Sequence, residues 1–189
     1  MSWYQPEPTV SMEMFYLLGV GSTTAIVDVG GGASLLTDRL IDRGFTDLSV
    51  LDISVAALDH CRDRMGSGAP VTLLRQDVLT WQPPRRFGLW HDRAVFHFLV
   101  DHEDRDRYLR VMGEALAPGS AVVLATFAED GPESCSGLPV ARYPADRLSA
   151  ALGRGFDVVA ARREIHTTPS GTVQPFTWVA ARTRTTEYP

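Results

Sequence analysis

An aspartate and a run of glycines have the types and spacing needed to hold a positively charged ligand. Asp28 stands two residues before three glycines at positions 30–32, which let the backbone turn tightly and approach a ligand closely. A carboxylate at that place repels phosphate and attracts an ammonium or a sulfonium. The dinucleotide-binding fingerprint also requires a glycine at position 35, where this chain has Leu35. The loop therefore disfavours NAD and favours a cationic ligand.

Two further aspartates follow the glycine run at the ends of apolar segments. Asp52 lies twenty residues after Gly32, where a carboxylate can accept hydrogen bonds from both ribose hydroxyls of a nucleoside. Asp77 follows the next apolar segment, where a carboxylate can accept a hydrogen bond from an adenine amino group. Taken alone, each aspartate is also typical of a helix cap or a loop. Their order behind the glycine run favours the ligand interpretation.

These residues need elements that bring them to one edge of a sheet. Short apolar runs alternate with amphipathic stretches, which is typical of an α/β sheet with crossover helices. Ligands of such a sheet bind beyond the carboxyl ends of the strands, where all three aspartates fall. We expect strands at 25–29, 48–51, 71–75, 87–90, 121–127, 156–165 and 174–182, and helices at 35–43, 54–65, 103–116 and 144–152.

The pattern predicts an α/β fold, a three-layer αβα sandwich with a seven-stranded, mostly parallel sheet whose last strand is antiparallel. We expect one domain over 1–189. Within it, 1–20 forms an N-terminal arm or helix that acts as a partial lid, and 21–128 forms the ligand-binding core. The remainder, 129–189, supplies a Gly-, Pro- and Ser-rich loop on the acceptor side and the C-terminal strands, joined by a hairpin around 169–171.

Composition excludes several classes of function. The formal net charge of -5 disfavours nucleic acid as a partner, and no 18-residue apolar run predicts a membrane span. The start lacks the pattern of a signal peptide, so we expect a cytoplasmic protein. All 18 basic residues are arginine, which excludes a Schiff-base lysine. The cysteines Cys61 and Cys135 form no CxxC pair, and the spacings of His91, His97 and His102 match no metal site, so we expect no bound metal.

The glycine run and the aspartates, in this order, resemble the class I, Rossmann-like S-adenosylmethionine-dependent methyltransferases over roughly 25–128. The resemblance implies S-adenosyl-L-methionine as cofactor, with Asp28 at the methionine amino end, Asp52 at the ribose and Asp77 at the adenine. One departure is Ser34, which stands where the family usually has the third glycine of its loop. The expected cofactor-binding residues are Asp28, Gly30, Gly31, Gly32, Asp52, Ile53, Asp77, Val78 and His91.

Three stretches, 89–99, 125–133 and 135–140, together with Trp3-Tyr4-Gln5, resemble a bacterial group of small methyltransferases. Proteins of that group usually carry an extra N-terminal helix that helps to cover the cofactor. This chain begins almost at the tryptophan. We therefore expect either that the chain is naturally short, or that its lid is reduced or supplied by a partner chain, for which a homodimer is one arrangement.

The candidates for catalysis lie at and after the end of the fourth predicted strand. Asp92 either orients or deprotonates the acceptor, or pairs with Arg93 or caps the following turn, and the sequence leaves these alternatives open. His91 is expected to contact the cofactor more than to act as a base. His97 is either catalytic or a buried histidine with satisfied hydrogen bonds. Methyl transfer needs little acid–base help, because alignment and desolvation supply much of the acceleration.

The candidates for binding the methyl acceptor come from both ends of the chain. Trp3 and Tyr4 are expected to fold over the site, while Cys135 and Tyr143 shape its far side from the loop after the fifth central strand. We predict transfer of a methyl group to an O, N or S atom of a small molecule. The alternatives are methylation of a protein side chain, or a non-catalytic protein that binds the cofactor and works in a complex.

Overall fold

In a computed structural model, the chain folds around one seven-stranded sheet, and the structure describes residues 5–66 and 68–185. The helices are α1 (Thr9–Leu17), α2 (Leu36–Asp42), α3 (Val55–Met65), α4 (His102–Ala115) and α5 (Ala145–Ala151), with a 3₁₀ turn η1 (Phe96–Phe98). The strands are β1 (Ile26–Val29), β2 (Leu48–Asp52), β3 (Val71–Arg75), β4 (Phe87–Arg93), β5 (Leu116–Phe127), β6 (Ser134–Cys135), β7 (Leu138–Pro139), β8 (Phe156–Thr167) and β9 (Val173–Thr183).

The strand order of the main sheet is β3-β2-β1-β4-β5-β9-β8. Neighbouring strands run parallel from β3 to β5, and β9 runs antiparallel to both β5 and β8. The seven-stranded sheet with an antiparallel last strand is therefore confirmed. Because β1 lies between β2 and β4, the winding of the chain reverses there, and a crevice forms beyond the carboxyl ends of these strands.

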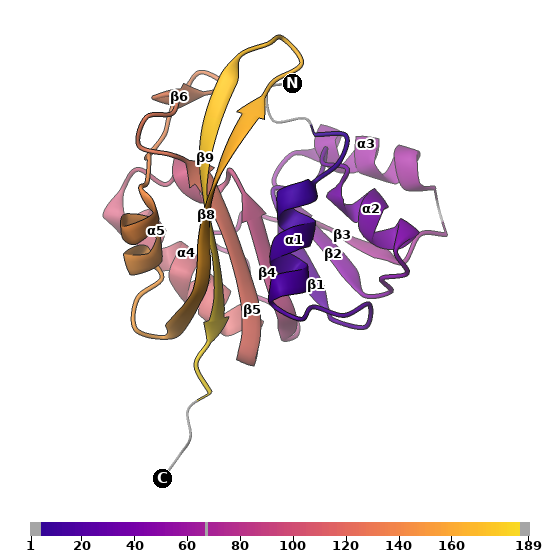
Figure 1. The fold of residues 1–189 in the computed structure, drawn as a ribbon. Helices are drawn as coiled ribbons and strands as arrows, with labels where there is room; N and C mark the ends of the chain where they lie inside the picture. Colours follow the sequence, from indigo (N-terminus) through magenta and orange to yellow (C-terminus); the bar gives the residue numbers. More distant parts are fainter. Residues whose placement is uncertain (1–4, 67, 186–189) are drawn as a thin grey trace.

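Successive side chains along each strand point to opposite faces of the sheet, where they form two apolar layers. On one face, Ile26 and Leu48 pack with side chains of α1 and α2, such as Phe15 and Leu40. On the other face, Val27 and its neighbours pack with side chains of α4 and α5. Figure 1 shows α1, α2 and α3 on one side of the sheet and α4 and α5 on the other, which is the expected three-layer arrangement.

Local signals placed most elements correctly. Ser54 caps α3, because its hydroxyl oxygen accepts a hydrogen bond from the amide of Ala57 at 3.2 Å. β5 begins at Leu116 rather than at 121, and residues 118–119 lie within it, where its pairing with β4 is irregular. The loop at 129–143 contains the short β6–β7 ribbon, which its composition did not indicate.

Several elements converge on the crevice. β4 runs three residues beyond its predicted end, to Arg93, so that residues 91–93 continue the strand toward the crevice. The chain then turns sharply at Ala94, a non-glycine residue with a φ of 76°.

In the described part of the chain, no helix is both long and apolar enough to cross a membrane.

Candidate functional site

A cavity of about 460 Å³ lies at the carboxyl ends of the central strands. Most of the residues predicted to bind a ligand line it: Asp28, Gly30, Gly31, Asp52, Ile53, Asp77, Val78, His91 and Cys135. Four predicted residues do not line it, namely Gly32, Asp92, His97 and Tyr143. Trp3 and Tyr4 lie outside the described residues.

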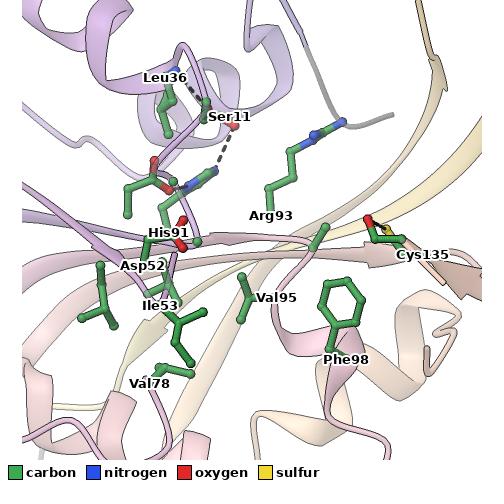
Figure 2. A pocket seen from close by; sticks show the side chains of 18 of the residues that line it. Ser11, Leu36, Asp52, Ile53, Val78, His91, Arg93, Val95, Phe98 and Cys135 are labelled. Atoms are coloured by element: carbon green, nitrogen blue, oxygen red, sulfur yellow. Dashed lines mark hydrogen bonds and ion pairs between the residues drawn. The ribbon is translucent and has the colours of Figure 1, made fainter. Parts of the chain in front are cut away.

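The cavity has two parts of different chemistry, which Figure 2 shows on opposite sides of Val95. We call these parts the cofactor half and the acceptor half, after the ligands that the sequence predicts for them. Carboxylates, glycines and one apolar side chain line the cofactor half: Asp28, Gly30, Gly31, Asp52, Asp77 and Val78. The acceptor half is lined mostly by apolar side chains and one cation: Arg93, Val95, Phe98, Leu99, Cys135 and Leu138. A cationic nucleoside suits the first half, and the second encloses a small apolar space beside it.

The glycine loop can follow its path only without side chains. Gly30 has a φ of +70°, and a Cβ built on it would lie 2.2 Å from Cγ2 of Val95. A Cβ on Gly31 would lie 2.1 Å from Oδ2 of Asp28. Both glycines therefore bring the backbone against the side chains that line the cavity, which is the close approach that their sequence position predicts.

Asp28 is buried and takes part in a chain of hydrogen bonds that reaches α1. Its Oδ1 lies 2.7 Å from Nδ1 of His91, and Nε2 of His91 lies 3.0 Å from the hydroxyl of Ser11. Because a carboxylate only accepts, Nδ1 donates to Asp28, and in the neutral ring Nε2 accepts from Ser11. Among the described residues, the buried Oδ2 of Asp28 has no hydrogen-bond partner. A buried acceptor without a donor, on the wall of a cavity, indicates where a ligand would supply one.

Backbone amides fix the carboxylate of Asp52. Its Oδ1 accepts a hydrogen bond from the amide of Ser54 at 2.8 Å, and its Oδ2 accepts one from the amide of Gly32 at 3.1 Å. Each carboxylate oxygen retains a second lone pair for a ligand hydroxyl. Gly32 thus acts on the site through Asp52, and a Cβ on Gly32 would lie 2.9 Å from the Oδ2 of Asp52.

The far end of the cofactor half combines a polar edge with apolar contacts. Asp77 is exposed, and its Oδ1 accepts a hydrogen bond from the amide of Leu79 at 2.9 Å. Val78 is buried beside it, whereas the side chain of Ile53 is 69% exposed. This arrangement offers a flat ring two apolar side chains and a carboxylate at its edge.

Asp92 does not face the cavity. It is fully buried, and its carboxylate accepts hydrogen bonds from the amides of Val95 (2.8 Å) and Phe96 (3.0 Å) and from the hydroxyl of Tyr108 (2.5 Å). Burial raises the pKa of Asp92 to about 6, although these hydrogen bonds lower it. The geometry matches the capping alternative, in which Asp92 shapes the turn that carries Val95, and direct contact with an acceptor has no support in this placement.

His97 is also withdrawn from the cavity. Its ring is fully buried between Phe98 and Phe127, with ring centroids 4.5 Å and 4.7 Å apart. Neither ring nitrogen has a hydrogen-bond partner in the described part of the chain, so His97 also differs from a buried histidine with satisfied hydrogen bonds. Burial, together with the charge of Arg93, lowers the pKa of His97 to about 3, so that the ring is neutral at neutral pH.

Tyr143 packs beneath the acceptor half rather than lining it, with its ring centroid 5.7 Å from that of Phe96. Cys135 does line this half, and burial raises the pKa of its thiol.

Within residues 5–66 and 68–185, no three His, Cys, Asp or Glu side chains gather as metal ligands would.

Sequence reasoning missed several residues that line the cavity. Ser11 comes from α1, 80 residues before His91, and no local pattern links the two. Arg93 was considered only as a partner for Asp92, yet it lines the acceptor half. A cation directly after the strand end was the available signal for Arg93. Phe98 and Leu138 carried no such signal, because apolar residues in loops have many roles.

Comparisons with known proteins agree with this geometry. Residues 26–119, about half of the chain, match the family described as a methyltransferase domain. A malonyl-[acyl-carrier protein] O-methyltransferase of Ilyobacter polytropus is 22% identical over 106 residues, which cover 56% of this chain and 40% of that protein. The chain thus spans less than half the length of this curated relative.

Solved structures share the fold over nearly the whole chain. An S-adenosylmethionine-dependent methyltransferase from Methanosarcina mazei superimposes with a TM-score of 0.75 at 12% identity, covering 94% of this chain and 98% of its own. A glycopeptide N-methyltransferase complexed with (S)-adenosyl-L-homocysteine superimposes with a TM-score of 0.69 at 19% identity, covering 95% and 91%. With its matching domain, its strand order and this fold, the chain belongs to the class I, Rossmann-like S-adenosylmethionine-dependent methyltransferases.

Proposed function

We propose that this protein binds S-adenosyl-L-methionine in the cofactor half of the cavity and transfers its methyl group to a small molecule in the acceptor half. The observation that carries the proposal is the buried Oδ2 of Asp28, which lines the cavity and has no hydrogen-bond partner among the described residues. An ammonium group supplies the missing donor together with a compensating charge.

The remaining residues of the cofactor half fit the rest of that molecule. Asp52, held by two backbone amides, would accept the ribose hydroxyls. Asp77 would accept a hydrogen bond from the adenine amino group, and Ile53 and Val78 would contact the adenine ring. The backbone at Gly30 and Gly31 would pack on the cofactor, because a side chain at either position would collide with Val95 or Asp28 in the cavity wall.

The chain's own residues accelerate such a reaction by alignment and exclusion of water. When bound, S-adenosylmethionine supplies a methyl group on a sulfonium, which is already strongly electrophilic. Val95, Phe98 and Leu99 line the acceptor half with apolar surface, which excludes water from an acceptor there and orients it. His91 and Ser11 hold the carboxylate of Asp28 in one orientation. None of these roles requires a catalytic base.

The setting that we propose is the bacterial cytoplasm, with a small-molecule acceptor and no nucleic acid. The formal net charge of -5 supports the second point, because a nucleic-acid substrate favours a basic surface. A homodimer is the arrangement in which a partner chain would complete the lid, and light scattering at the assay concentration measures it.

Methyl transfer from radiolabelled S-adenosylmethionine tests the proposal. The protein is incubated separately with a pool of small metabolites and with a protein extract freed of small molecules. We expect label in the small-molecule pool that disappears in Asp28→Asn. Label only in the protein extract would instead identify a protein side-chain methyltransferase. Binding of the cofactor without transfer to either pool would identify a non-catalytic cofactor-binding protein.

A further inference from the structure

Arg93 gives the acceptor half of the cavity a positive charge. It is the last residue of β4, and its Nε and Nη2 atoms are shielded from solvent. Its guanidinium carbon lies 4.5 Å from the centre of the Phe176 ring, in a cation–π contact that holds the side chain in place. In Figure 2, Arg93 and Cys135 lie on one side of Val95, with Asp52 and Ile53 on the other. A guanidinium is a preferred partner for carboxylates, since it presents several N–H groups in a planar fork.

The charges of the cavity are separated along its length. Among its described lining residues, all three carboxylates, Asp28, Asp52 and Asp77, belong to the cofactor half, and the single arginine belongs to the acceptor half. Of the acids in the neighbouring loop, Asp130 pairs with Arg163 and Glu133 pairs with Arg142. The two halves therefore prefer ligands of opposite charge.

Among the described acids, Glu164 is the one whose charge raises the pKa of Arg93. Burial lowers the pKa of Arg93 to about 10, while the nearby charge of Glu164 raises it, so the guanidinium stays charged at neutral pH. The carboxylate of Glu164 accepts hydrogen bonds from Nε2 of Gln5 (2.6 Å) and Nε1 of Trp178 (2.8 Å). Glu164 is thus held outside the cavity lining and balances part of the charge without occupying the acceptor half.

In the described lining of the same half, no side chain is suited to remove a proton from an acceptor. Among the described residues that line it, the protic side chains are the guanidinium of Arg93, the thiol of Cys135 and the hydroxyl of Ser136. Burial raises the pKa of the Cys135 thiol, which keeps it protonated. An acceptor suited to this space therefore arrives already deprotonated, as a carboxylic acid does at neutral pH with its pKa of about 4.

Resting on the proposed function, we propose that the methyl acceptor is a small carboxylic acid, bound as its anion by Arg93 and converted into a methyl ester. A carboxylate oxygen forms the new bond to the methyl carbon, and the methyl–sulfur bond breaks with its electron pair returning to sulfur. The sulfonium becomes a neutral thioether and the carboxylate a neutral ester. No proton is released, so the step requires no base.

The product of transfer distinguishes this reaction from its alternatives. Wild-type protein is given methyl-labelled S-adenosylmethionine and matched panels of small carboxylic acids, amines and phenols. Methyl esters release labelled methanol in alkali, whereas N-methyl and aryl O-methyl products keep their label. We expect label that alkali releases, from the acid panel only. Alkali-stable label from amines or phenols overturns the carboxylate proposal while leaving the proposed function intact.

Variants of Arg93 test its role without relying on turnover. Arg93→Gln is expected to weaken binding of the carboxylic acid to the S-adenosylhomocysteine complex about tenfold or more, with Arg93→Lys intermediate. Affinity for S-adenosylhomocysteine itself should stay within about twofold of wild type. Arg107→Gln is the matched control, because Arg107 is an exposed arginine of α4 that pairs with Asp104.

The outcomes distinguish the role of Arg93 from the identity of the acceptor. Unchanged binding of the acid in Arg93→Gln overturns the role of Arg93. If Arg93→Gln does not fold, Arg93→Lys decides the role of the arginine, and the alkali test on the wild type decides the acceptor. Absence of S-adenosylhomocysteine binding by the wild type overturns the proposed function and the carboxylate proposal with it.

Discussion

The two halves of the cavity are built by different means. In the cofactor half, backbone and short carboxylates form the walls. Gly30 and Gly31 have no side chains that would fill the space, and backbone amides hold the carboxylate of Asp52. In the acceptor half, longer side chains from β4, the following turn and the β6–β7 ribbon form the walls. A half made of backbone tolerates little change, whereas a half made of side chains can be altered one contact at a time. Substitutions should therefore act strongly on the first half and selectively on the second.

The largest effect is expected from Gly31→Ala. The new Cβ would lie 2.1 Å from Oδ2 of Asp28, whose carboxylate is buried and hydrogen-bonded to His91 and so has little room to move. We expect the dissociation constant for S-adenosylhomocysteine to rise about 100-fold or more, measured by calorimetry. Gly113→Ala in α4 is the control, because no atom apart from its chain neighbours and the backbone of its own helix lies within 4 Å of the new Cβ. Equal affinity in both variants would show that the glycine loop does not form the cofactor site.

Asp52→Ala should act less severely. It removes the acceptor proposed for the ribose hydroxyls but leaves the glycine loop in place. We expect affinity for S-adenosylhomocysteine to fall about 10- to 100-fold, in line with charge-assisted hydrogen bonds of roughly 1.5–3 kcal/mol. Asp59→Ala, which removes an exposed carboxylate of α3, should leave it unchanged. A loss below about threefold in Asp52→Ala would remove this aspartate from the cofactor half.

Acid should destabilise the region beneath the acceptor half through His97. Its pKa in the folded protein, about 3, lies below the unfolded value of about 6.5, so the unfolded chain binds more protons between these values. This contribution to stability is complete above pH 6.5 and is lost as the pH falls. Between pH 6.5 and 5.5, the free energy of unfolding should fall by about 1 kcal/mol on account of this group.

His97→Leu isolates that contribution in urea titrations at several pH values. Asp92 opposes it, since a folded pKa of about 6, above the ordinary 3.8, gives stability that is lost as the pH rises through 6. The stability of His97→Leu relative to wild type should therefore increase as the pH falls from 6.5. A relative stability that does not vary with pH would mean that His97 titrates as it does in water.

The smallest effect is expected from Leu138→Ala. Leu138 lines the acceptor half but is 58% exposed, so its removal takes away only part of an apolar contact. The KM for the acceptor should rise about two- to fivefold, while affinity for S-adenosylhomocysteine stays within error. Weakened cofactor binding would show that the two halves are not independent.

How much the sequence alone predicts differs between these halves. The fold and the cofactor half are encoded locally, because Asp28, the glycines and Asp52 each stand at a strand end that hydrophobic pattern locates. Their ligand roles stay predictions until binding is measured. The acceptor half depends on contacts between distant segments, such as Arg93 with Phe176. Strand periodicity places residues on a face but says nothing of which side chains meet there.

Asp92 illustrates this limit. At the end of β4 it has the position of a residue that meets an acceptor, and its type fits that role. Its actual contacts come from Tyr108, sixteen residues later, and from the amides of the turn that follows the strand. Whether such a carboxylate faces the cavity or the turn depends on the backbone path at Ala94, whose φ of 76° no residue preference would predict.

Calorimetric titration of the wild-type protein with S-adenosylhomocysteine measures the proposed cofactor binding without a methyl acceptor. We expect saturable binding of one molecule per chain, with an affinity that Asp28→Asn reduces at least about tenfold, because this variant removes the charge of the carboxylate that we propose to hold the methionine ammonium. Absence of binding heat at high micromolar concentration, confirmed by no shift in melting temperature, would contradict it. Binding that Asp28→Asn leaves unchanged would contradict the placement of the cofactor.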